Sequence, residues 1–468
     1  MCGIFFTTLD ADTKLNLNEF TETVAGLIKH RGIYPPDFYQ EANLLFAHSL
    51  MPVQGIAPVR QPLVEGQYVL IFSGELWQHQ GETSDTLYLF NALCESDDVS
   101  ETLRNLRGMF ALVFKDEGAI YFASDVFGEV PLYFWHTSHK LSVASEIKQL
   151  VAIGAPLKEV KSALPGLLYT FQNEELSSVS YHHWSFTNNA LDFDAKYLRE
   201  LVRKSVQEHY TTIDLQQSAV LLSGGLDSTI IAYELAQLGL KEAYTVGIHP
   251  DCIDFKTAQR TSTQLGLRHN TVVATELNTD CALAVTEVSN RSVVEEFCCH
   301  IALSNALSAN NVRVVFSGSG ADEIFVGYQH LLRFVTKQNR NTLQRHFVEK
   351  HHTLDLRASN KTYMLNAVEV RNPFLSVDLM NYAATFDVDK LLIGAKRLMK
   401  LALREAYQPV IGDLAYNPKL IAFETMGIKR HFRERSGDSP FIYRRRFKEI
   451  FSQPLLLPDF VARAKTIH

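Results

Sequence analysis

The sequence lacks the features that mark several classes of protein. Only six of its 468 residues are cysteine, and none of them forms the paired spacing of a structural zinc site. No apolar run approaches the roughly 18 residues that a membrane-spanning helix needs. The start of the chain, Met-Cys-Gly-Ile-Phe-Phe, has no basic segment ahead of an apolar one. We therefore expect a cytoplasmic protein with reduced thiols that does not enter a membrane.

An excess of charge of either sign is also missing. Forty-five basic and 52 acidic side chains leave a net charge of −7, and 46% of the residues are hydrophobic. This balance excludes a disordered chain and argues against a nucleic-acid surface. The basic run Arg444-Arg445-Arg446, followed by Lys448, is interpreted as a solvated helix face. The length fits two to four domains of about 100 to 200 residues each.

The pattern of residues changes once along the chain, near residue 190. Up to about residue 184, short apolar or alternating runs separated by Gly, Pro and Asp predict a sheet-rich region; the runs are 43–47, 68–72, 111–114, 120–123 and 132–135. A polar stretch follows. Residues 196–208 then show helical spacing, with Tyr197, Leu198, Leu201, Val202 and Val206 on one side. We predict one domain over residues 1–190 and a second over residues 191–468.

The second domain alternates buried-looking strands with helices. Strands are expected at residues 218–222, 243–248, 270–273 and 312–316, with helices at residues 229–236 and 257–265. Such alternation predicts a parallel sheet covered by helices on both faces. After Asp322 the chain is expected to be mostly helical. In sheets of this kind, ligands bind beyond the carboxyl ends of the strands.

A glycine-rich loop follows the first of these strands. Its residues, Ser223-Gly224-Gly225-Leu226-Asp227-Ser228, lead directly into a helix. Glycines let the backbone turn tightly and approach a ligand, and a helix N-terminus offers free N–H groups to an anion. The loop lacks the lysine of the GxxxxGK[ST] motif, so it suits pyrophosphate better than transfer of a γ-phosphoryl group. An ordinary strand-to-helix turn is the alternative.

A second loop of the same kind follows the strand at residues 312–316. Its residues are Ser317-Gly318-Ser319-Gly320-Ala321-Asp322-Glu323. Both loops are expected at one edge of the sheet, where Asp227 and Asp322 could together hold a Mg²⁺ ion with phosphate oxygens and water. Taken alone, Asp322 is equally well explained as a helix N-cap.

These motifs, with the Met-Cys-Gly-Ile start, resemble the asparagine synthetase family. That family joins a class II glutamine amidotransferase domain to an ATP-pyrophosphatase domain. Further matching segments run through the whole chain: His30-Arg31-Gly32, Gln61-Pro62, Ser84-Asp85-Thr86, Ala144-Ser145-Glu146-Ile147-Lys148, Asn360-Lys361, Glu369-Val370-Arg371-Asn372-Pro373-Phe374-Leu375 and Lys400 before Leu403-Arg404-Glu405. The resemblance implies an α/β protein of two domains: an N-terminal nucleophile αββα sandwich, and a parallel-sheet domain with a mostly helical C-terminal part.

The resemblance also implies roles for individual residues. Cys2 would become the N-terminal nucleophile once Met1 is removed, with its own α-amine, of ordinary pKa about 7.7, as the base; an ordinary cysteine is the alternative. Lys400 and Lys419 would act in the second domain, Lys419 on an acyl-adenylate. The other implied contacts are Ser73, Gly74, Glu75 and Asp85 with glutamine, and Leu222, Ser223, Gly224, Gly225, Asp227, Ser228, Val246, Ser317 and Gly318 with ATP.

Two departures from the family pattern fall in the glutamine pocket. Leu50 stands where the family has the arginine that binds the α-carboxylate of glutamine, and Ser73 replaces an asparagine that donates to the oxyanion. One oxyanion donor is worth about 10² to 10³ in turnover. Arg60 could contact the carboxylate from another direction, or be an ordinary exposed arginine. We expect half of a glutamine pocket.

Other departures fall in the second domain. Ser319 replaces a glutamate that works beside the acceptor, and Ser376 replaces an aspartate. ATP activation is therefore expected to persist while recognition of the acceptor differs. Three functions stay open: an asparagine synthetase using ATP, Mg²⁺ and glutamine or ammonia; a related ligase for another acid or amine, including lactam closure; and a non-catalytic regulatory paralogue. The expected partners are small molecules, with a homodimer as a possible assembly.

Overall fold

The first part of the chain forms two stacked antiparallel sheets. In the computed structural model, whose described residues are 1–9, 16–53, 58–78, 84–184, 193–210, 213–328, 340–386, 399–417, 425–428, 431–432 and 441–468, each of these sheets has six strands. The first sheet has the order β10 (Lys161–Ser162), β8 (Tyr133–His136), β9 (Leu141–Ala144), β1 (Gly3–Thr8), β3 (Leu44–Ser49) and β2 (Asp37–Glu41). The second has the order β12 (Glu175–Ser180), β11 (Leu167–Gln172), β7 (Ala119–Ser124), β6 (Gly108–Asp116), β5 (Tyr68–Leu76) and β4 (Leu63–Glu65).

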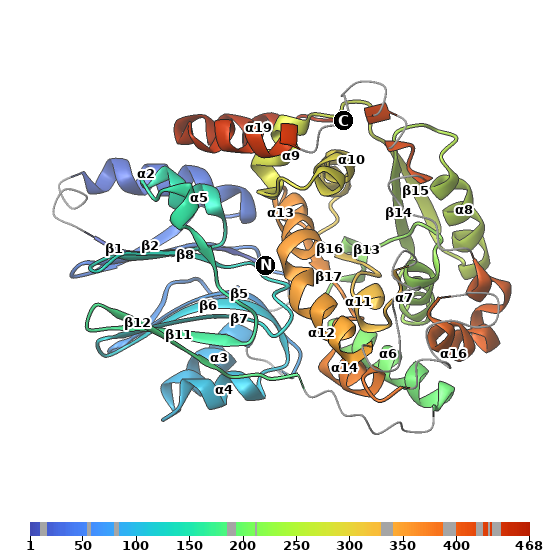
Figure 1. Ribbon diagram of the computed structural model, residues 1–468, viewed down its shortest axis with the longest axis horizontal. Helices are drawn as coiled ribbons and strands as arrows, with labels where there is room; N and C mark the ends of the chain where they lie inside the picture. The colour runs from blue at the N-terminus through green and yellow to red at the C-terminus, as the bar shows by residue number, and fades with distance from the viewer. Residues whose placement is uncertain are drawn as a thin grey trace.

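Helices cover the outer face of each sheet (Figure 1). α2 (Leu17–Ile28) and α5 (Ile147–Ala152) lie on the first sheet, and α3 (Asp85–Cys94) and α4 (Val99–Asn105) on the second. The sheets bury their facing sides against each other, with Phe6, Phe46, Ile71 and Val113 in the shared core. The four layers confirm the predicted αββα sandwich. The predicted boundary near residue 190 lies outside the described residues.

The second part of the chain is built on a five-stranded parallel sheet. Its order is β15 (Arg268–Val273), β14 (Glu242–Gly247), β13 (Ser218–Leu221), β16 (Val314–Phe316) and β17 (Glu369–Arg371). The chain runs from β13 to β14 on one side and later returns to β16 on the other. This change of direction puts the switch point of the sheet at the carboxyl ends of β13 and β16, the usual ligand position in such sheets. The two glycine-rich loops follow these two strands.

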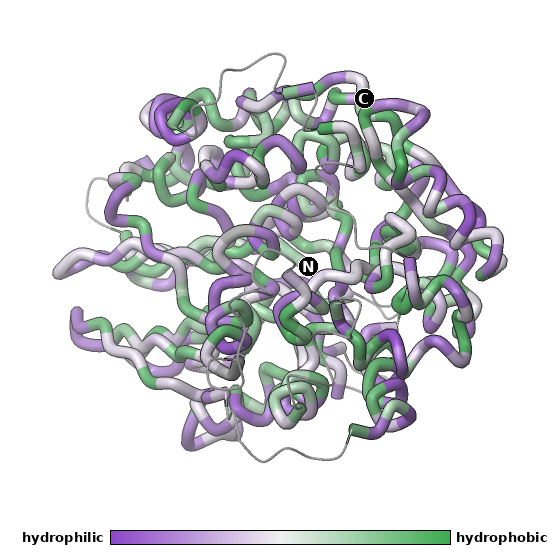
Figure 2. Tube along the Cα trace, turned by 45° about the vertical axis from the view of Figure 1, so that its right-hand side comes forward, coloured by the Kyte–Doolittle hydropathy of each residue, from purple (hydrophilic) through white to green (hydrophobic). Residues whose placement is uncertain are grey.

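Helices surround this sheet and form the C-terminal part. They are α6 (Ala195–Tyr210), α7 (Leu226–Gln237), α8 (Ile253–Leu265), α9 (Thr279–Thr286), α10 (Arg291–Ala309), α11 (Ala321–Ile324), α12 (Arg340–His351), α13 (Arg357–Met364), α14 (Val377–Ala383), α16 (Leu401–Ile411), α19 (Phe441–Phe451) and α20 (Leu457–Ala464). Hydrophilic and hydrophobic residues alternate along the outer helices (Figure 2). Among the described residues, no helix combines the length and the apolar character needed to cross a bilayer.

The predicted elements are confirmed, with two corrections. The apolar side of α6 buries Leu198, Leu201, Val202 and Val206 as expected, but Tyr197 is half exposed and packs edge-on against Tyr382. Strand β17 was not predicted, because three residues with two charges have no strand pattern. Its charged side chains, Glu369 and Arg371, are fully buried.

A network of buried charges joins the two parts of the chain. Arg31 donates to the Glu146 carboxylate at 2.8 Å, to the Asn360 side-chain oxygen at 2.9 Å, and to the Cys2 carbonyl at 3.0 Å. Lys148 pairs with Glu146 at 2.7 Å, and Glu287 accepts from both Lys148 and Lys361. A buried charge is costly unless it is paired. The paired groups of this network come from several of the segments that match the family, and together they hold Cys2 against the second part of the chain.

Candidate active sites

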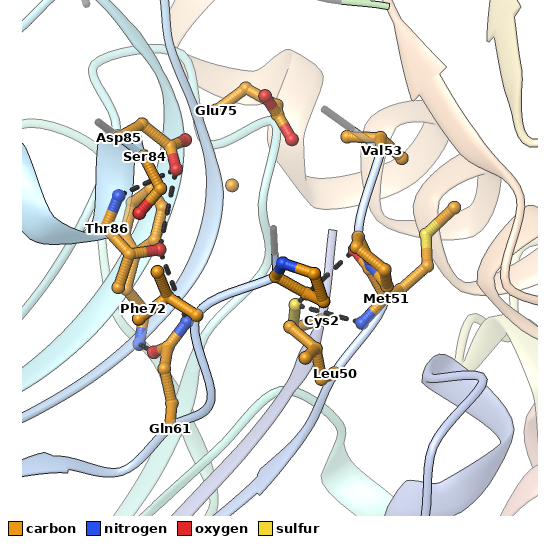
Figure 3. Close-up of a pocket in the computed structure, with 14 residues that line it drawn as sticks. Cys2, Leu50, Met51, Val53, Gln61, Phe72, Glu75, Ser84, Asp85 and Thr86 are labelled. Carbon is orange, nitrogen blue, oxygen red and sulfur yellow. Dashed lines mark hydrogen bonds between the residues drawn. The ribbon is translucent and has the colours of Figure 1, made fainter. Parts of the chain in front are cut away.

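Cys2 lies at the floor of a pocket between the two sheets of the first domain (Figure 3). It immediately precedes β1, and 7% of its surface is exposed. The described lining residues are Cys2, Leu50, Met51, Pro52, Val53, Pro58, Val59, Gln61, Phe72, Gly74, Glu75, Ser84, Asp85 and Thr86. The structure therefore brings together Cys2, Gly74, Glu75 and Asp85, four residues of the expected glutamine pocket.

Met1 is buried beside this pocket, and its ammonium group pairs with Glu369 of β17. The Met51 N–H donates to the Cys2 sulfur at 3.4 Å. Burial raises the pKa of the Cys2 thiol to about 11, although the Met1 ammonium acts to lower it. The thiol is therefore protonated near neutral pH while Met1 is present. Only the thiolate is a strong nucleophile.

We predict that Cys2 reacts slowly with iodoacetamide in protein that retains Met1. With a pKa about 11, the thiolate fraction at pH 8 is roughly 10⁻³, and it increases about tenfold with each pH unit up to 10. The measurement is the rate of Cys2 alkylation between pH 7 and 10, followed by peptide mass spectrometry. A short synthetic peptide with the same first residues is the control, and its rate should level off above pH 9. A plateau already at pH 8 in the folded protein would contradict this account.

Two carboxylates face Cys2 from the opposite wall of the pocket (Figure 3). Burial, with the nearby Glu369, raises the pKa of Glu75 to about 8, although Arg371 at 3.3 Å acts to lower it. Burial also raises the pKa of Asp85 to about 6, against the effect of N–H donors from Thr86 and Leu76. A bound ammonium group would favour the ionised form of both groups. The pocket therefore suits a cationic head group such as the α-ammonium of an amino acid.

The wall that should hold a substrate carboxylate is apolar. Leu50 is buried there, and none of the described lining residues is Arg, Lys or His. Ser73 accepts from the Cys2 N–H and donates to the Cys2 carbonyl, both at 2.9 Å, so its hydroxyl is engaged by the backbone. Arg60 pairs with Asp37 at 2.9 Å, and both side chains are partly exposed. The structure thus places Arg60 in a surface ion pair.

The loop after β13 has a shape that requires glycine. Gly224 has φ of +79°, and an added Cβ would lie 2.7 Å from the backbone of Thr257. Gly225 caps α7, while the hydroxyls of Ser223 and Ser228 lie 3.2 Å apart within the turn. Leu222 and Val246 are buried at the ends of the adjacent strands, and Ser317 lies in the facing loop. The Gly225 N–H donates to the Ser223 hydroxyl at 3.4 Å and the Ser228 hydroxyl donates to the Gly225 carbonyl at 3.2 Å, so these groups are held together at the sheet edge and the N-terminus of α7, a position that suits phosphate.

The two glycine-rich loops touch each other. An added Cβ on Gly318 would lie 2.8 Å from the Ser228 nitrogen and 2.9 Å from the Asp227 carbonyl carbon. Lys400, buried and in the left-handed backbone region, places its ammonium group against Asp227 and at 2.7 Å from Asp322. Although burial acts to lower it, these two carboxylates raise the pKa of Lys400. Gly320, not Asp322, is the N-cap of α11.

The chemistry of this cluster fits Mg²⁺. Asp227 and Asp322 both pair with the Lys400 ammonium, and Mg²⁺ commonly takes one or two carboxylates with phosphate oxygens and water. Within the described part of the chain, no three His, Cys, Asp or Glu side chains are grouped to hold a metal ion. The cluster thus suits a cation that gains its other ligands from a bound phosphate. Lys419 lies outside the described residues.

Two contacts at this site were missed by the sequence analysis. Asn417 donates to the Gly224 carbonyl at 2.8 Å and so fixes the first loop from a distant segment. An added Cβ on Gly327 would lie 2.0 Å from Asp322 Oδ1 and 2.1 Å from Lys400 Cε. Neither residue belongs to a motif that was singled out. Asn417 gains its role from the first loop, and Gly327 gains its role from Asp322 and Lys400.

We predict that Gly327→Ala strongly reduces turnover at the loop site. The new methyl group must displace Asp322, Lys400 or the backbone, and misplacement by about 1 Å can cost about 10² in rate. The measurement is ATP-dependent pyrophosphate release, compared with that of the unchanged protein. Gly118→Ala is the matched control, because nothing lies within 4 Å of a Cβ at that turn. Equal turnover by Gly327→Ala and Gly118→Ala would contradict the assigned role of Gly327.

Comparison with known proteins gives a family match for each part of the chain, the part with the Cys2 pocket and the part with the two glycine-rich loops. The asparagine synthase family model matches residues 197–354 and 335–454, and the glutamine amidotransferase domain model matches residues 1–186. The chain belongs to the asparagine synthase family. It is an ATP-dependent carbon–nitrogen ligase of the asparagine synthetase type, and the resemblance seen in the sequence is confirmed.

Individual relatives are distant but align over most of their length. The glutamine-hydrolysing asparagine synthetase B of Escherichia coli is 28% identical over 90% of this chain and 81% of its own. A probable asparagine synthetase of Dictyostelium discoideum is 24% identical over 90% of this chain and 83% of its own. A solved structure of the allosteric regulatory enzyme of purine biosynthesis aligns with 58% of this chain and 80% of its own, at 14% identity and a TM-score of 0.33. That last similarity is too low to inform function.

Proposed function

We propose that this protein activates a carboxylic acid as its adenylate and converts the adenylate into an amide. The acid attacks the α-phosphorus of ATP, pyrophosphate leaves, and ammonia or another amine then attacks the acyl-adenylate to release AMP. The single observation that carries this proposal is the meeting of both glycine-rich loops at Lys400, which places a cation between Asp227 and Asp322 where a polyphosphate would lie.

The loop residues have distinct parts in this proposal. The backbone of Ser223, Gly224 and Gly225, the Ser228 hydroxyl and the Ser317-Gly318 turn cradle the phosphates, while Leu222 and Val246 contact the adenine nucleoside. Lys400 neutralises charge that develops on the departing pyrophosphate. Asp227 and Asp322 would hold Mg²⁺, which when bound adds to that neutralisation. Lys419 is proposed to stabilise the adduct formed when the amine attacks.

The nitrogen donor is proposed to be ammonia at least as readily as glutamine. Cys2, once N-terminal, would attack the side-chain amide of glutamine, with Glu75 and Asp85 binding the α-ammonium and Gly74 shaping the turn beside them. Leu50 offers no charge to the α-carboxylate, and the hydroxyl of Ser73 is engaged by the Cys2 backbone. These two positions support a weak glutaminase.

The acceptor is proposed to be aspartate or a related acid. The retention of Asp227, Asp322 and Lys400 as one contacting cluster beside both glycine-rich loops favours an active enzyme over a regulatory paralogue. Ser319 in the second loop favours an acceptor site that differs from that of the family. We expect small-molecule substrates, action in the cytoplasm, and a homodimer as a possible assembly.

A screen of carboxylic acids tests this function. Purified protein is incubated with ATP, Mg²⁺ and ammonia, and L-aspartate, its homologues and β-amino acids are compared for release of AMP and pyrophosphate. We expect one acid to increase AMP formation strongly over the acid-free rate, and Lys400→Met to remove that increase. Formation of ADP instead of AMP would exclude adenylation.

A further inference from the structure

Three side chains at the second loop contact one another in series. The Ser319 hydroxyl lies 3.1 Å from Nε2 of His351, and Nδ1 of the same ring lies 3.1 Å from the Glu323 carboxylate. They come from three elements: Ser319 from the loop after β16, Glu323 from α11, and His351 from the end of α12, the helix beside α11 (Figure 1). Both ring nitrogens of His351 are thus committed, one to a hydroxyl and one to a carboxylate.

The burial of the three groups differs in a way that suits catalysis. The side chains of His351 and Glu323 are 5% and 4% exposed, whereas Ser319 is half-buried. Tyr328 donates a second hydrogen bond to Glu323. Glu323 thus contacts His351 on one side and Tyr328 on the other, which fixes its position. A fixed carboxylate orients the imidazole, and the hydroxyl is the most accessible member.

The hydroxyl also lies next to the proposed nucleotide site. Gly318, the residue before Ser319, packs against the backbone of Asp227 and Ser228. The Ser319 N–H donates to the Ser317 hydroxyl at 3.1 Å, which fixes the turn. Ser319, His351 and Glu323 therefore meet beside Gly318, in the loop that would hold the phosphate of an acyl-adenylate.

We propose that Ser319 is an acyl acceptor, with His351 as its general base and Glu323 as the positioning residue of His351. The proposal rests on the function proposed above for the source of the acyl group, and it replaces direct attack of the amine on the acyl-adenylate by transfer through Ser319. Ser319 Oγ bonds to the carbonyl carbon of the acyl-adenylate as its proton passes to His351 Nε2. The bond from that carbon to the phosphate oxygen breaks, and AMP leaves with the electron pair. The amine then attacks the serine ester, the bond from the carbonyl carbon to Ser319 Oγ breaks, and His351 returns its proton to Ser319 Oγ. The proton lost from the amine nitrogen passes to solvent as the amide is released.

A serine-directed fluorophosphonate tests this arrangement without ATP or a carboxylic acid. An activated serine displaces fluoride and becomes a stable phosphonate ester, which peptide mass spectrometry assigns to a residue. We expect labelling of Ser319 in the full-length protein and no labelling of that peptide in Ser319→Ala. His351→Gln should slow labelling by about 10² or more, as for loss of a general base. Glu323→Gln should slow it less.

Matched controls separate activation from folding. Ser178→Ala, at an exposed position of β12 away from both sites, should leave labelling of Ser319 unchanged, and thermal unfolding should show that each variant remains folded. No labelling of Ser319 in the unchanged protein would overturn the proposal, and so would labelling that is unaffected by His351→Gln. The assay contains no adenylation substrates, so its result does not depend on whether the proposed ligase function is correct.

A second measurement tests the acyl group itself. With ATP, Mg²⁺ and the acid selected by the screen, but no nitrogen donor, we expect AMP in an amount equal to that of the enzyme and an ester adduct on Ser319. If amide formation requires His351 but no adduct forms under these conditions, the covalent step is wrong and His351 acts directly on the amine.

Discussion

Asp227→Asn and Asp322→Asn are each expected to reduce the formation of AMP and pyrophosphate by about 10³-fold or more. Each change removes a carboxylate from the pair that contacts Lys400. Several kcal/mol of charge stabilisation at the leaving pyrophosphate depend on this arrangement, and each 1.36 kcal/mol is tenfold in rate. The measurement is the acid-dependent rate of pyrophosphate release at saturating ATP.

Two controls make this prediction specific. Asp251→Asn removes a charge from an exposed position in the same domain and should retain full activity. Thermal unfolding should confirm that both site variants stay folded, since Asn can still accept from Lys400. Near-normal AMP formation in either variant would remove that residue from the site.

Ammonia is expected to support the ligase at least as well as glutamine. A charged hydrogen bond to the α-carboxylate is worth about 1.5 to 3 kcal/mol, and an oxyanion donor about 2.7 to 4 kcal/mol. With Leu50 and Ser73 at these positions, the two losses together reduce glutaminase efficiency by roughly 10³ or more if they add. The measurement compares both donors in protein whose N-terminus has been checked by mass spectrometry, because retained Met1 would silence Cys2 independently.

Restoring the missing groups provides the strongest check. The double variant Leu50→Arg and Ser73→Asn should increase glutamine-dependent turnover by at least about tenfold, while Leu50→Met with Ser73→Thr should not. Cys2→Ala should abolish only the glutamine-dependent rate and barely affect the ammonia-dependent one. Efficient glutamine use by the unchanged protein, lost in Cys2→Ala, would show that another group replaces the missing clamp.

Much of the architecture could be predicted because the glycine-rich loops both end the strands and carry the candidate binding residues. Glycine loops directly after buried strands determine where β13 and β16 end, so Asp227 and Asp322 could be assigned to one sheet edge before any contact was known. Alternation of strand and helix predicted the parallel sheet for the same reason. Strand β17 was not predicted because its charged side chains are paired with groups far away in the sequence: Glu369 pairs with Met1, and Arg371 lies 3.3 Å from Glu75.

Contacts between distant segments could not be predicted from spacing. Ser319 and His351 lie on different elements 32 positions apart, and a lone histidine in a helix gives no signal of a catalytic pair. Gly327 and Asn417 likewise acquire a role only from the position of Lys400 and of the first loop. Departures such as Leu50 and Ser73 were visible in the sequence. The engagement of the Ser73 hydroxyl by the Cys2 backbone was not.

The most direct test of the account is the transfer of oxygen from acid to nucleotide. The acid selected by the screen is labelled with ¹⁸O in its carboxyl group and incubated with ATP, Mg²⁺, ammonia and the purified protein. Adenylation joins a carboxylate oxygen to the α-phosphorus, so the account predicts one ¹⁸O atom in the phosphate of each AMP formed. AMP without the label, or ¹⁸O in inorganic phosphate with ADP as the nucleotide product, would contradict it.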